Sequence, residues 1–319
     1  MKTSKKFISD MLGLTALAAM VVSCNAGSNV SVYVAGYEEN ANGINVATVW
    51  KNGEVQTLSN GAEDASANFV CVLGSDVYVA GYENEVATVW KNGVAQTLSK
   101  TADDRNAAAY ALYISGSDVY VAGHDNEVAT IWKNGEAQAL SQNAGENDAE
   151  AYSVYVSGSD VYVAGHDNEV ATVWKNGVAQ ALSKPTGESD AKAYSVYVSG
   201  SDVYVSGYEN ETAMLWKNGE AQALSGSGES AEALFVCVSG RDVFVAGSKG
   251  EVATVWKNGV AQELADGTEA RSVYVVGSDV YVAGCERTVA KVWKNGVAQT
   301  LSDSTSVNAC ACSVAVAAQ

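Results

Sequence analysis

Residues 152–183 decide the fold, and their sequence is YSVYVSG-SDVYVAG-HDNEVATVWKNG-VAQALS. Within each piece apolar and polar side chains alternate, and Val, Tyr and Thr are frequent, which is typical of a β-strand. Asn176-Gly177 separates the third piece from the fourth. Asn-Gly favours the tight type I′ hairpin, because both turn positions need positive φ. With a second short turn at 158–160, the stretch predicts four antiparallel strands, which we call A, B, C and D.

The same unit recurs along the chain. The tetrapeptide WKNG, which ends strand C and begins the C–D turn, occurs seven times and contains every tryptophan: Trp50, Trp90, Trp132, Trp174, Trp216, Trp256 and Trp293. The intervals between successive tryptophans are 40, 42, 42, 42, 40 and 37 residues. A period near forty with four short strands per unit is typical of the blades of a β-propeller. No helical periodicity follows residue 24, so helical repeats are excluded.

The first predicted strand of the chain is a strand B, and the last is a strand A. Strand B occurs seven times, first at 30–36, but strand A precedes it only six times. A seventh strand A lies at the far end, where CSVAVA at 312–317 aligns with YSVYVS at 152–157. We therefore predict an all-β, seven-bladed propeller over residues 30–319, with the C-terminal strand completing the first blade. Closure of this kind leaves no seam between the first and the last blade that could fray.

These repeats resemble β-propeller repeats as a class over residues 30–318. They lack the combination of Gly-His with a following Trp-Asp that is found in WD40 blades, and they lack the double glycine of kelch blades. The tryptophan in every third strand resembles the packing tryptophans of other propellers, whose flat ring fills the space between neighbouring sheets. Its indole N–H can find a fixed partner on the adjacent blade. The alternative is a set of exposed aromatic platforms for sugar or choline.

The first 23 residues have a different character. A basic start precedes an apolar stretch, Met11 to Val22, which is too short to span a bilayer. The sequence Val-Val-Ser-Cys at 21–24 resembles the lipobox of a bacterial lipoprotein signal peptide. The resemblance implies cleavage before Cys24, acylation of that residue and stable membrane attachment through two or more acyl chains. Residues 24–29 would then be a short tether, with the protein facing the periplasm or the cell surface. An ordinary secretory signal with a chance cysteine is the alternative.

The charge balance restricts the partners. The chain has a formal net charge of −18. Such a surface repels nucleic acid and anionic lipid head groups. It suits a monomer that stays in solution apart from its lipid anchor, or a surface that attracts cations.

The strand order divides the turns between two faces. The A–B and C–D turns share one face, which we call the hairpin face, and the B–C and D–A connections share the other, which we call the loop face. The loop face carries the variable segments and a ring of carboxylates. Because binding residues concentrate in variable loops on a constant scaffold, we expect the ligand there. The candidate residues are Tyr37, Tyr82, His124, Asp125, His166, Asp167, Tyr208 and Glu209.

The expected ligand of the loop face is a carbohydrate or a protein of the cell envelope. Ca²⁺ is an alternative, because carboxylate and amide oxygens suit it, and a merely solvated acidic surface is another. No other cofactor and no defined metal site is expected. His124 and His166 could converge on a metal, but residues 115–141 and 157–183 match at 25 of 27 positions, so duplication accounts for the pair.

Near-identical blades place like groups symmetrically, whereas catalysis needs unlike groups together. We therefore expect a binding module rather than an enzyme. The alternatives are a hydrolase or lyase that draws residues from several blades, and a purely structural scaffold of the envelope.

Five cysteines remain after Cys24. Cys71 and Cys237 occupy the same place in strand A of blades two and six, which are not neighbours, so we expect both to stay reduced and buried. Cys285 heads the B–C loop of blade seven, and Cys310 leads into strand A of blade one. Ring closure makes these two blades adjacent, so the sequence favours a Cys285–Cys310 disulfide. Cys312 is the alternative partner, and three unrelated thiols are the remaining possibility.

Overall fold

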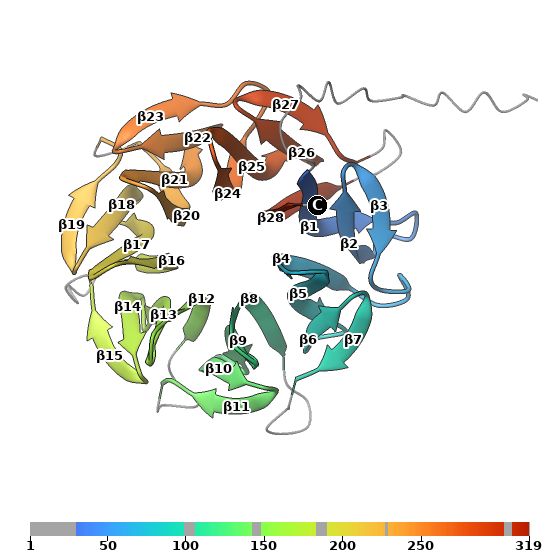
Figure 1. The fold of residues 1–319 in the computed structure, drawn as a ribbon, viewed down its shortest axis with the longest axis horizontal. Helices are drawn as coiled ribbons and strands as arrows, with labels where there is room; N and C mark the ends of the chain where they lie inside the picture. Colours follow the sequence, from blue (N-terminus) through green and yellow to red (C-terminus); the bar gives the residue numbers. More distant parts are fainter. Residues whose placement is uncertain are drawn as a thin grey trace, which may run out of the picture.

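The computed structural model describes residues 30–98, 106–141, 148–182, 190–226, 229–302 and 308–318. These residues form 28 strands in seven four-stranded antiparallel sheets, which stand side by side in a ring (Figure 1). The prediction of an all-β, seven-bladed propeller is confirmed. The signal peptide and tether at 1–29 lie outside the described residues. Within the described ranges no helix has the length and apolar character needed to cross a membrane.

Each blade consists of strands A to D in that order from the channel outward. Blade one is β28 (Ala309–Ala318), β1 (Val30–Glu39), β2 (Asn45–Lys51) and β3 (Glu54–Thr57). Blades two to four are β4 (Ala65–Leu73), β5 (Asp76–Glu83), β6 (Val86–Lys91) and β7 (Val94–Thr97); β8 (Ala107–Ser115), β9 (Asp118–Asp125), β10 (Ala129–Lys133) and β11 (Glu136–Ala139); and β12 (Ala149–Ser157), β13 (Asp160–Asp167), β14 (Val170–Lys175) and β15 (Val178–Ala181). Blades five to seven are β16 (Ala191–Ser199), β17 (Asp202–Glu209), β18 (Thr212–Lys217) and β19 (Glu220–Ala223); β20 (Ala231–Ser239), β21 (Asp242–Lys249), β22 (Val252–Lys257) and β23 (Val260–Glu263); and β24 (Glu269–Val276), β25 (Asp279–Glu286), β26 (Val289–Lys294) and β27 (Val297–Thr300).

The C-terminal strand closes the ring as predicted. Strand β28 pairs antiparallel with β1, and Val34 lies opposite Val314. In Figure 1 the red β28 lies beside the dark blue β1, so the two ends of the chain share one sheet.

The tryptophans of the WKNG repeats are buried in the packing between blades. All seven tryptophan side chains are 0 % exposed, so they cannot serve as aromatic platforms. Trp256 Nε1 donates to Leu224 O of the preceding blade at 3.0 Å, and Trp293 Nε1 donates to Ala265 O at 2.9 Å. Four indoles have no acceptor within the described part of the chain: Trp50, Trp90, Trp174 and Trp216. Ring packing, and not the expected N–H bond, is therefore the feature common to all seven.

The asparagine and glycine form the predicted type I′ turn. Asn176 has φ 52° and Gly177 has φ 80°, both in the left-handed region. Asn176 Oδ1 also accepts a hydrogen bond from the Val161 backbone N–H at 2.8 Å, which ties the C–D turn to strand B. The same bond recurs in all seven blades.

The lysine of the repeat is paired rather than free. Lys175 Nζ lies 2.7 Å from Asp160 Oδ2 and 5.1 Å from the ring centroid of Tyr162. Six blades have this lysine–aspartate pair, at 2.7 to 2.9 Å. The positive charge of these lysines on the hairpin face is therefore largely neutralised by aspartates of the same face.

A β-bulge in strand A shapes the inner wall. In blade four the pairing of β12 with β13 shifts register between Ala151 and Ser153, so Tyr152 is the extra residue. Bulges of this kind redirect a side chain. The bulge lies against Gly165, where an added Cβ would be 1.9 Å from Glu150 O, so only glycine fits. This explains why every strand B contains a glycine at this place.

Candidate functional site

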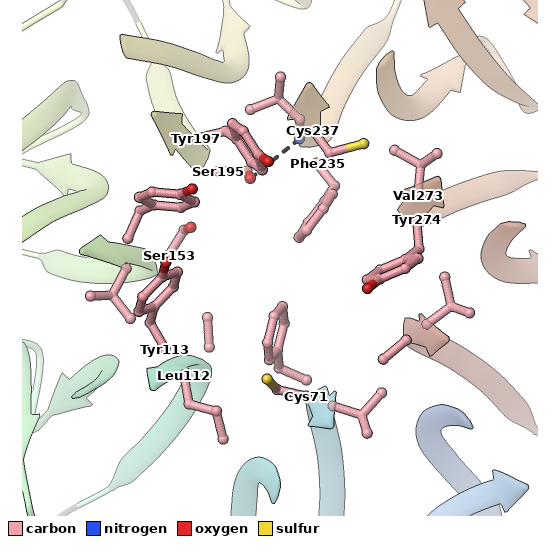
Figure 2. A pocket seen from close by; sticks show the side chains of 18 of the residues that line it. Cys71, Leu112, Tyr113, Ser153, Ser195, Tyr197, Phe235, Cys237, Val273 and Tyr274 are labelled. Carbon is pink, nitrogen blue, oxygen red and sulfur yellow. Dashed lines mark hydrogen bonds between the residues drawn. The ribbon is translucent and has the colours of Figure 1, made fainter. Parts of the chain in front are cut away.

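The seven A strands line a central channel with a cavity at its hairpin-face end. Because side chains alternate along a strand, every second residue of each A strand points into this channel. The cavity has a volume of about 420 Å³ and is lined mainly by apolar and aromatic side chains. Figure 2 shows the rings of Tyr113, Tyr197, Phe235 and Tyr274 around it. The lining ends near the A–B turns, where Leu73 is 54 % exposed, so the cavity opens on the hairpin face.

Two phenylalanines narrow the channel at the inner end of the cavity. The rings of Phe69 and Phe235 come from blades two and six, and their centroids are 6.4 Å apart with an interplanar angle of 30°. At the equivalent position four blades have a buried serine whose Oγ accepts a backbone N–H of the next blade at 3.2 to 3.4 Å: Ser153, Ser195, Ser272 and Ser313. The phenylalanines therefore stand where other blades use a small residue to join their neighbours.

Three tyrosines form an arc along one side of the cavity. The ring centroids of Tyr113 and Tyr155 are 4.8 Å apart, and those of Tyr155 and Tyr197 are 4.9 Å apart. Burial, followed by the neighbouring Tyr155, raises the pKa of Tyr113 to about 12. Burial also raises the pKa of Tyr155 and of Tyr197. All three hydroxyls consequently remain protonated near neutral pH and can donate hydrogen bonds.

Cys71 and Cys237 also lie on the cavity wall. Both are free thiols, as expected, but they are partly exposed rather than buried because their strand position faces the channel. Burial raises the pKa of Cys237 to about 12 and also raises that of Cys71. Neither is therefore an activated thiolate.

On the loop face the structure buries half of the residues that the sequence suggested for ligand binding. His124, Asp125, His166 and Tyr208 are buried, and His166 is 0 % exposed. Their burial limits access of a ligand to them, and a role of these four residues in ligand binding stays a prediction. The physical reason for the burial of His166 is the bulge: the ring of Tyr152 covers it, with centroids 5.6 Å apart and an interplanar angle of 18°. The other four candidates, which are partly exposed, are Tyr37, Tyr82, Asp167 and Glu209.

Hydrogen bonds tie the loop-head tyrosines to the D–A connections. Tyr82 donates its hydroxyl to Asp64 Oδ2 at 3.0 Å, and Tyr208 donates to Asp190 Oδ2 at 2.7 Å. Burial raises the pKa of Tyr37 to about 12. The hydroxyls of Tyr82 and Tyr208 are thus each bound to an aspartate of a D–A connection.

Tyrosines of three neighbouring A strands contact one another at this end of the channel. Tyr152 lies between Tyr110 and Tyr194, with ring centroids 5.3 and 5.2 Å away. Tyr110 donates its hydroxyl to Glu150 Oε1 at 3.0 Å, and Tyr152 also hydrogen-bonds this carboxylate. Glu150 Oε1 in turn lies 3.4 Å from His124 Nδ1. These side chains form one polar cluster on the channel wall of blades three to five, which we call the tyrosine cluster.

The two histidines are neutral members of this tyrosine cluster. Burial lowers the pKa of His124, with nearby carboxylates, Glu150 first, acting in the opposite direction. Burial and the Lys192 ammonium lower the pKa of His166, although Asp148 lies 3.5 Å from its Nε2. Removal from water outweighs the attraction of the carboxylates at both positions.

The cysteines of the ring closure lie together. Cys285 of blade seven and Cys310 of blade one are adjacent and buried, and both are thiols in this structure. Their disulfide therefore stays a prediction. Cys312 is next to Cys310, and a hydrogen bond from Cys310 lowers the pKa of Cys312 to about 7 with help from the Arg271 charge.

Sequence reasoning missed the aromatic cavity. The signal was present as a second aromatic in strand A, for example Tyr155 three residues after Tyr152. This second aromatic residue remained unassigned because simple alternation places residues three apart on opposite faces of the sheet. The bulge at Tyr152, which changes this, cannot be seen in the sequence.

Fold and site together define a seven-bladed β-propeller with an aromatic cavity in its channel. No family model matches the sequence, and the curated proteins compared with it include no match. Among solved structures, a puromycin-hydrolysing peptidase of Mycobacterium tuberculosis is similar, with 12 % identity, a TM-score of 0.56, and coverage of 85 % of this chain and 51 % of that one. The extracellular domain of a putative one-component system from B. thetaiotaomicron has 9 % identity and a TM-score of 0.51, covering 79 % of this chain and 37 % of that one. The computationally designed protein Ika8 has 21 % identity and a TM-score of 0.49, covering 88 % and 90 %. Likenesses this distant establish the fold alone.

Proposed function

We propose that this chain is an exported, lipid-anchored binding module that takes a small ligand into the aromatic cavity of its channel. The observation that carries the proposal is the cavity itself: about 420 Å³, open at one end, narrowed at the other by Phe69 and Phe235. Small-molecule sites are concave and mostly apolar, with a few placed polar groups. Here those polar groups are the hydroxyls of Tyr113, Tyr155 and Tyr197.

The lining suits a ring-shaped ligand with apolar faces and a polar edge. Aromatic side chains offer flat apolar contacts, and a tyrosine adds a hydroxyl at the rim of each contact. Sugars and phenolic compounds share this chemistry. The carbohydrate expectation from the sequence is thus kept, but moved from the loop face to the cavity.

The anchor would hold the open end of the cavity near the membrane. Val30, the first residue of β1, pairs with Ala318 at the hairpin-face end of blade one. A tether of the six residues 24–29 reaches at most about 20 Å. Exposed valines at the C–D turns, such as Val178 at 71 %, give this face an apolar character that suits the membrane interface.

The test is a binding screen of the mature chain against monosaccharides, short glycans and phenolic compounds, by titration calorimetry. Tyr155→Ala should weaken binding of a hit at least tenfold, because it removes the middle ring of the arc. Glu127→Gln, an exposed change on the loop face, is the matched control and should leave affinity unchanged. The opposite pattern would move the ligand to the loop face and overturn the cavity assignment. A hit from one compound class alone would identify which of the two chemistries is recognised.

A further inference from the structure

The repeat departs from its pattern at one blade boundary, where three cysteines converge. At the head of the B–C loop blade seven has Cys285, whereas blade four has His166. In strand A, blade one has Cys310 and Cys312 at the places of Glu150 and Tyr152 in blade four. Because the blades are otherwise similar in sequence, three cysteines at one blade boundary indicate a role that is specific to this boundary.

The geometry of this junction is that of a ligand set. One ligand atom from each of Glu269, Cys285 and Cys310 lies within 4.8 Å of the others, and both cysteines are buried. Glu269 is the cross-strand partner of Cys285 in blade seven. Cys285 Sγ lies 3.8 Å from Glu269 Oε2, and Cys310 comes from blade one across the ring closure.

We propose that Cys285, Cys310 and Glu269, with Cys312 as the fourth ligand, bind a thiophilic divalent cation of the Zn²⁺ type. Zinc prefers four tetrahedral ligands, with Zn–S distances of about 2.3 Å, which sets sulfur atoms about 3.8 Å apart. The three donors that lie within 4.8 Å of one another, from Glu269, Cys285 and Cys310, need to approach by about 1 Å to meet that geometry. Cys312 lies outside this group of three, so its thiol has to move further to become the fourth ligand. Three thiolates favour zinc over hard cations such as Mg²⁺ and Ca²⁺.

Arg271 completes the environment. Its Nε lies 2.8 Å from Glu269 Oε2, the oxygen that also lies 3.8 Å from Cys285 Sγ, so the guanidinium holds the carboxylate beside the cysteines. Three thiolates, one carboxylate and Zn²⁺ sum to a charge of −2, and Arg271 reduces it to −1. A buried site of high negative charge without this arginine would be costly.

A bound metal gives a role to more of the side chains at this junction than a disulfide does. A Cys285–Cys310 bridge would use two of the three thiols and leave Cys312 and Glu269 without a role. A metal uses all four, and it joins blades seven and one at the ring closure. Bound metal should therefore stabilise the whole ring by mass action.

The experiment uses the mature chain, freed of metal and kept reduced, and titrated with Zn²⁺. We expect one equivalent bound with a rise in Tm, and with Co²⁺ a thiolate-to-cobalt charge-transfer absorption. Cys285→Ser and Cys310→Ser should abolish both effects, and Glu269→Gln should weaken Zn²⁺ binding at least tenfold. Cys71→Ser and Cys237→Ser, at the opposite end of the channel, are the controls and should bind as the parent does.

The cobalt spectrum of the unmutated chain keeps the test decisive even if a serine variant fails to fold. No zinc binding by the reduced chain, or cobalt binding without charge-transfer absorption, would overturn the proposal. So would zinc binding that survives both serine substitutions. Recovery of a Cys285–Cys310 disulfide from protein that holds no metal would establish the disulfide in its place.

Discussion

Phe69 and Phe235 meet across the central channel, although they belong to blades two and six, which are not neighbours in the ring. The contact exists because all seven A strands face one axis, so large side chains at the same height reach each other. It narrows the channel at the inner end of the aromatic cavity.

This contact should appear as a coupling energy. In a double-mutant cycle of Phe69→Ala and Phe235→Ala, we expect an interaction of about 0.5–1.5 kcal/mol in the free energy of unfolding. Urea denaturation of the four proteins measures it. Phe69→Ala combined with Phe244→Ala is the control, because Phe244 lies in strand B, and these two effects should add within about 0.5 kcal/mol. Strict additivity in the first cycle would contradict the contact.

The buried tryptophans should be costly to truncate. Trp174→Ala removes a fully buried ring and should lower the free energy of unfolding by about 3–5 kcal/mol. Trp256→Phe should lower it by about 1 kcal/mol more than Trp174→Phe does, because Trp256 loses its N–H bond to Leu224 O, whereas Trp174 Nε1 has no acceptor among the described residues. Denaturation of the three variants tests both statements, and equal losses for the two phenylalanine variants would refute the second.

The glycine at the bulge should tolerate no side chain. Gly165→Ala would bring a Cβ within 1.9 Å of Glu150 O, so we expect the largest loss of stability of any single methyl addition in blade four. Gly158→Ala is the matched control: its φ is +61°, but no atom lies within 4 Å of the added Cβ. That variant should lose only the strain of a left-handed alanine, about 1–2 kcal/mol. Similar melting temperatures for both would show that the bulge yields easily.

Acid should destabilise the fold through its buried imidazoles. Burial lowers the pKa of His124 and His166 below the value of 6.5 that they have when exposed. The unfolded chain therefore binds more protons as pH falls below 6.5, so the free energy of unfolding falls with it. His124→Gln with His166→Gln should flatten this dependence between pH 6.5 and 5. Burial raises the pKa of Glu232, so protonation of this carboxylate stabilises the fold as pH falls and opposes the effect of the histidines. The contribution of the histidines is therefore the difference in pH dependence between the variant and the parent. An unchanged slope would show that the imidazoles titrate normally.

Cys24→Ser tests the anchor. If the lipobox is used, the variant expressed in a bacterium should leave the membrane fraction and appear in the soluble exported fraction. Ser23→Thr, which keeps the cysteine, is the control and should remain with the membrane. Continued membrane association of Cys24→Ser would rule out acylation as the means of attachment.

Local chemistry made the fold predictable. Asn176-Gly177 specifies a type I′ turn because of its backbone preferences, and alternation marks the strands without reference to the rest of the chain. The ring closure could be predicted by counting strands. Strand B occurs seven times but strand A precedes it only six times, so the seventh strand A has to come from residues 312–317. The neighbourhood of Cys285 and Cys310 followed from that closure.

The site was less predictable. His166 stands in a polar loop sequence, so exposure was the natural expectation, but a bulge that breaks the alternation turns Tyr152 over it. The bulge is invisible in the sequence, because the extra residue looks like any other member of strand A.

By itself the sequence determined the strands, the turns, the number of blades and the order in which they close, because each of these depends on short-range backbone preference and on periodicity. Only the tertiary structure decided which side chains share the channel. Phe69 and Phe235 are far apart in the chain, and their contact depends on the radius of a closed seven-bladed ring and on the height at which each bulge directs its neighbours. Those quantities are set by the packing of all seven sheets at once, so no single repeat encodes them.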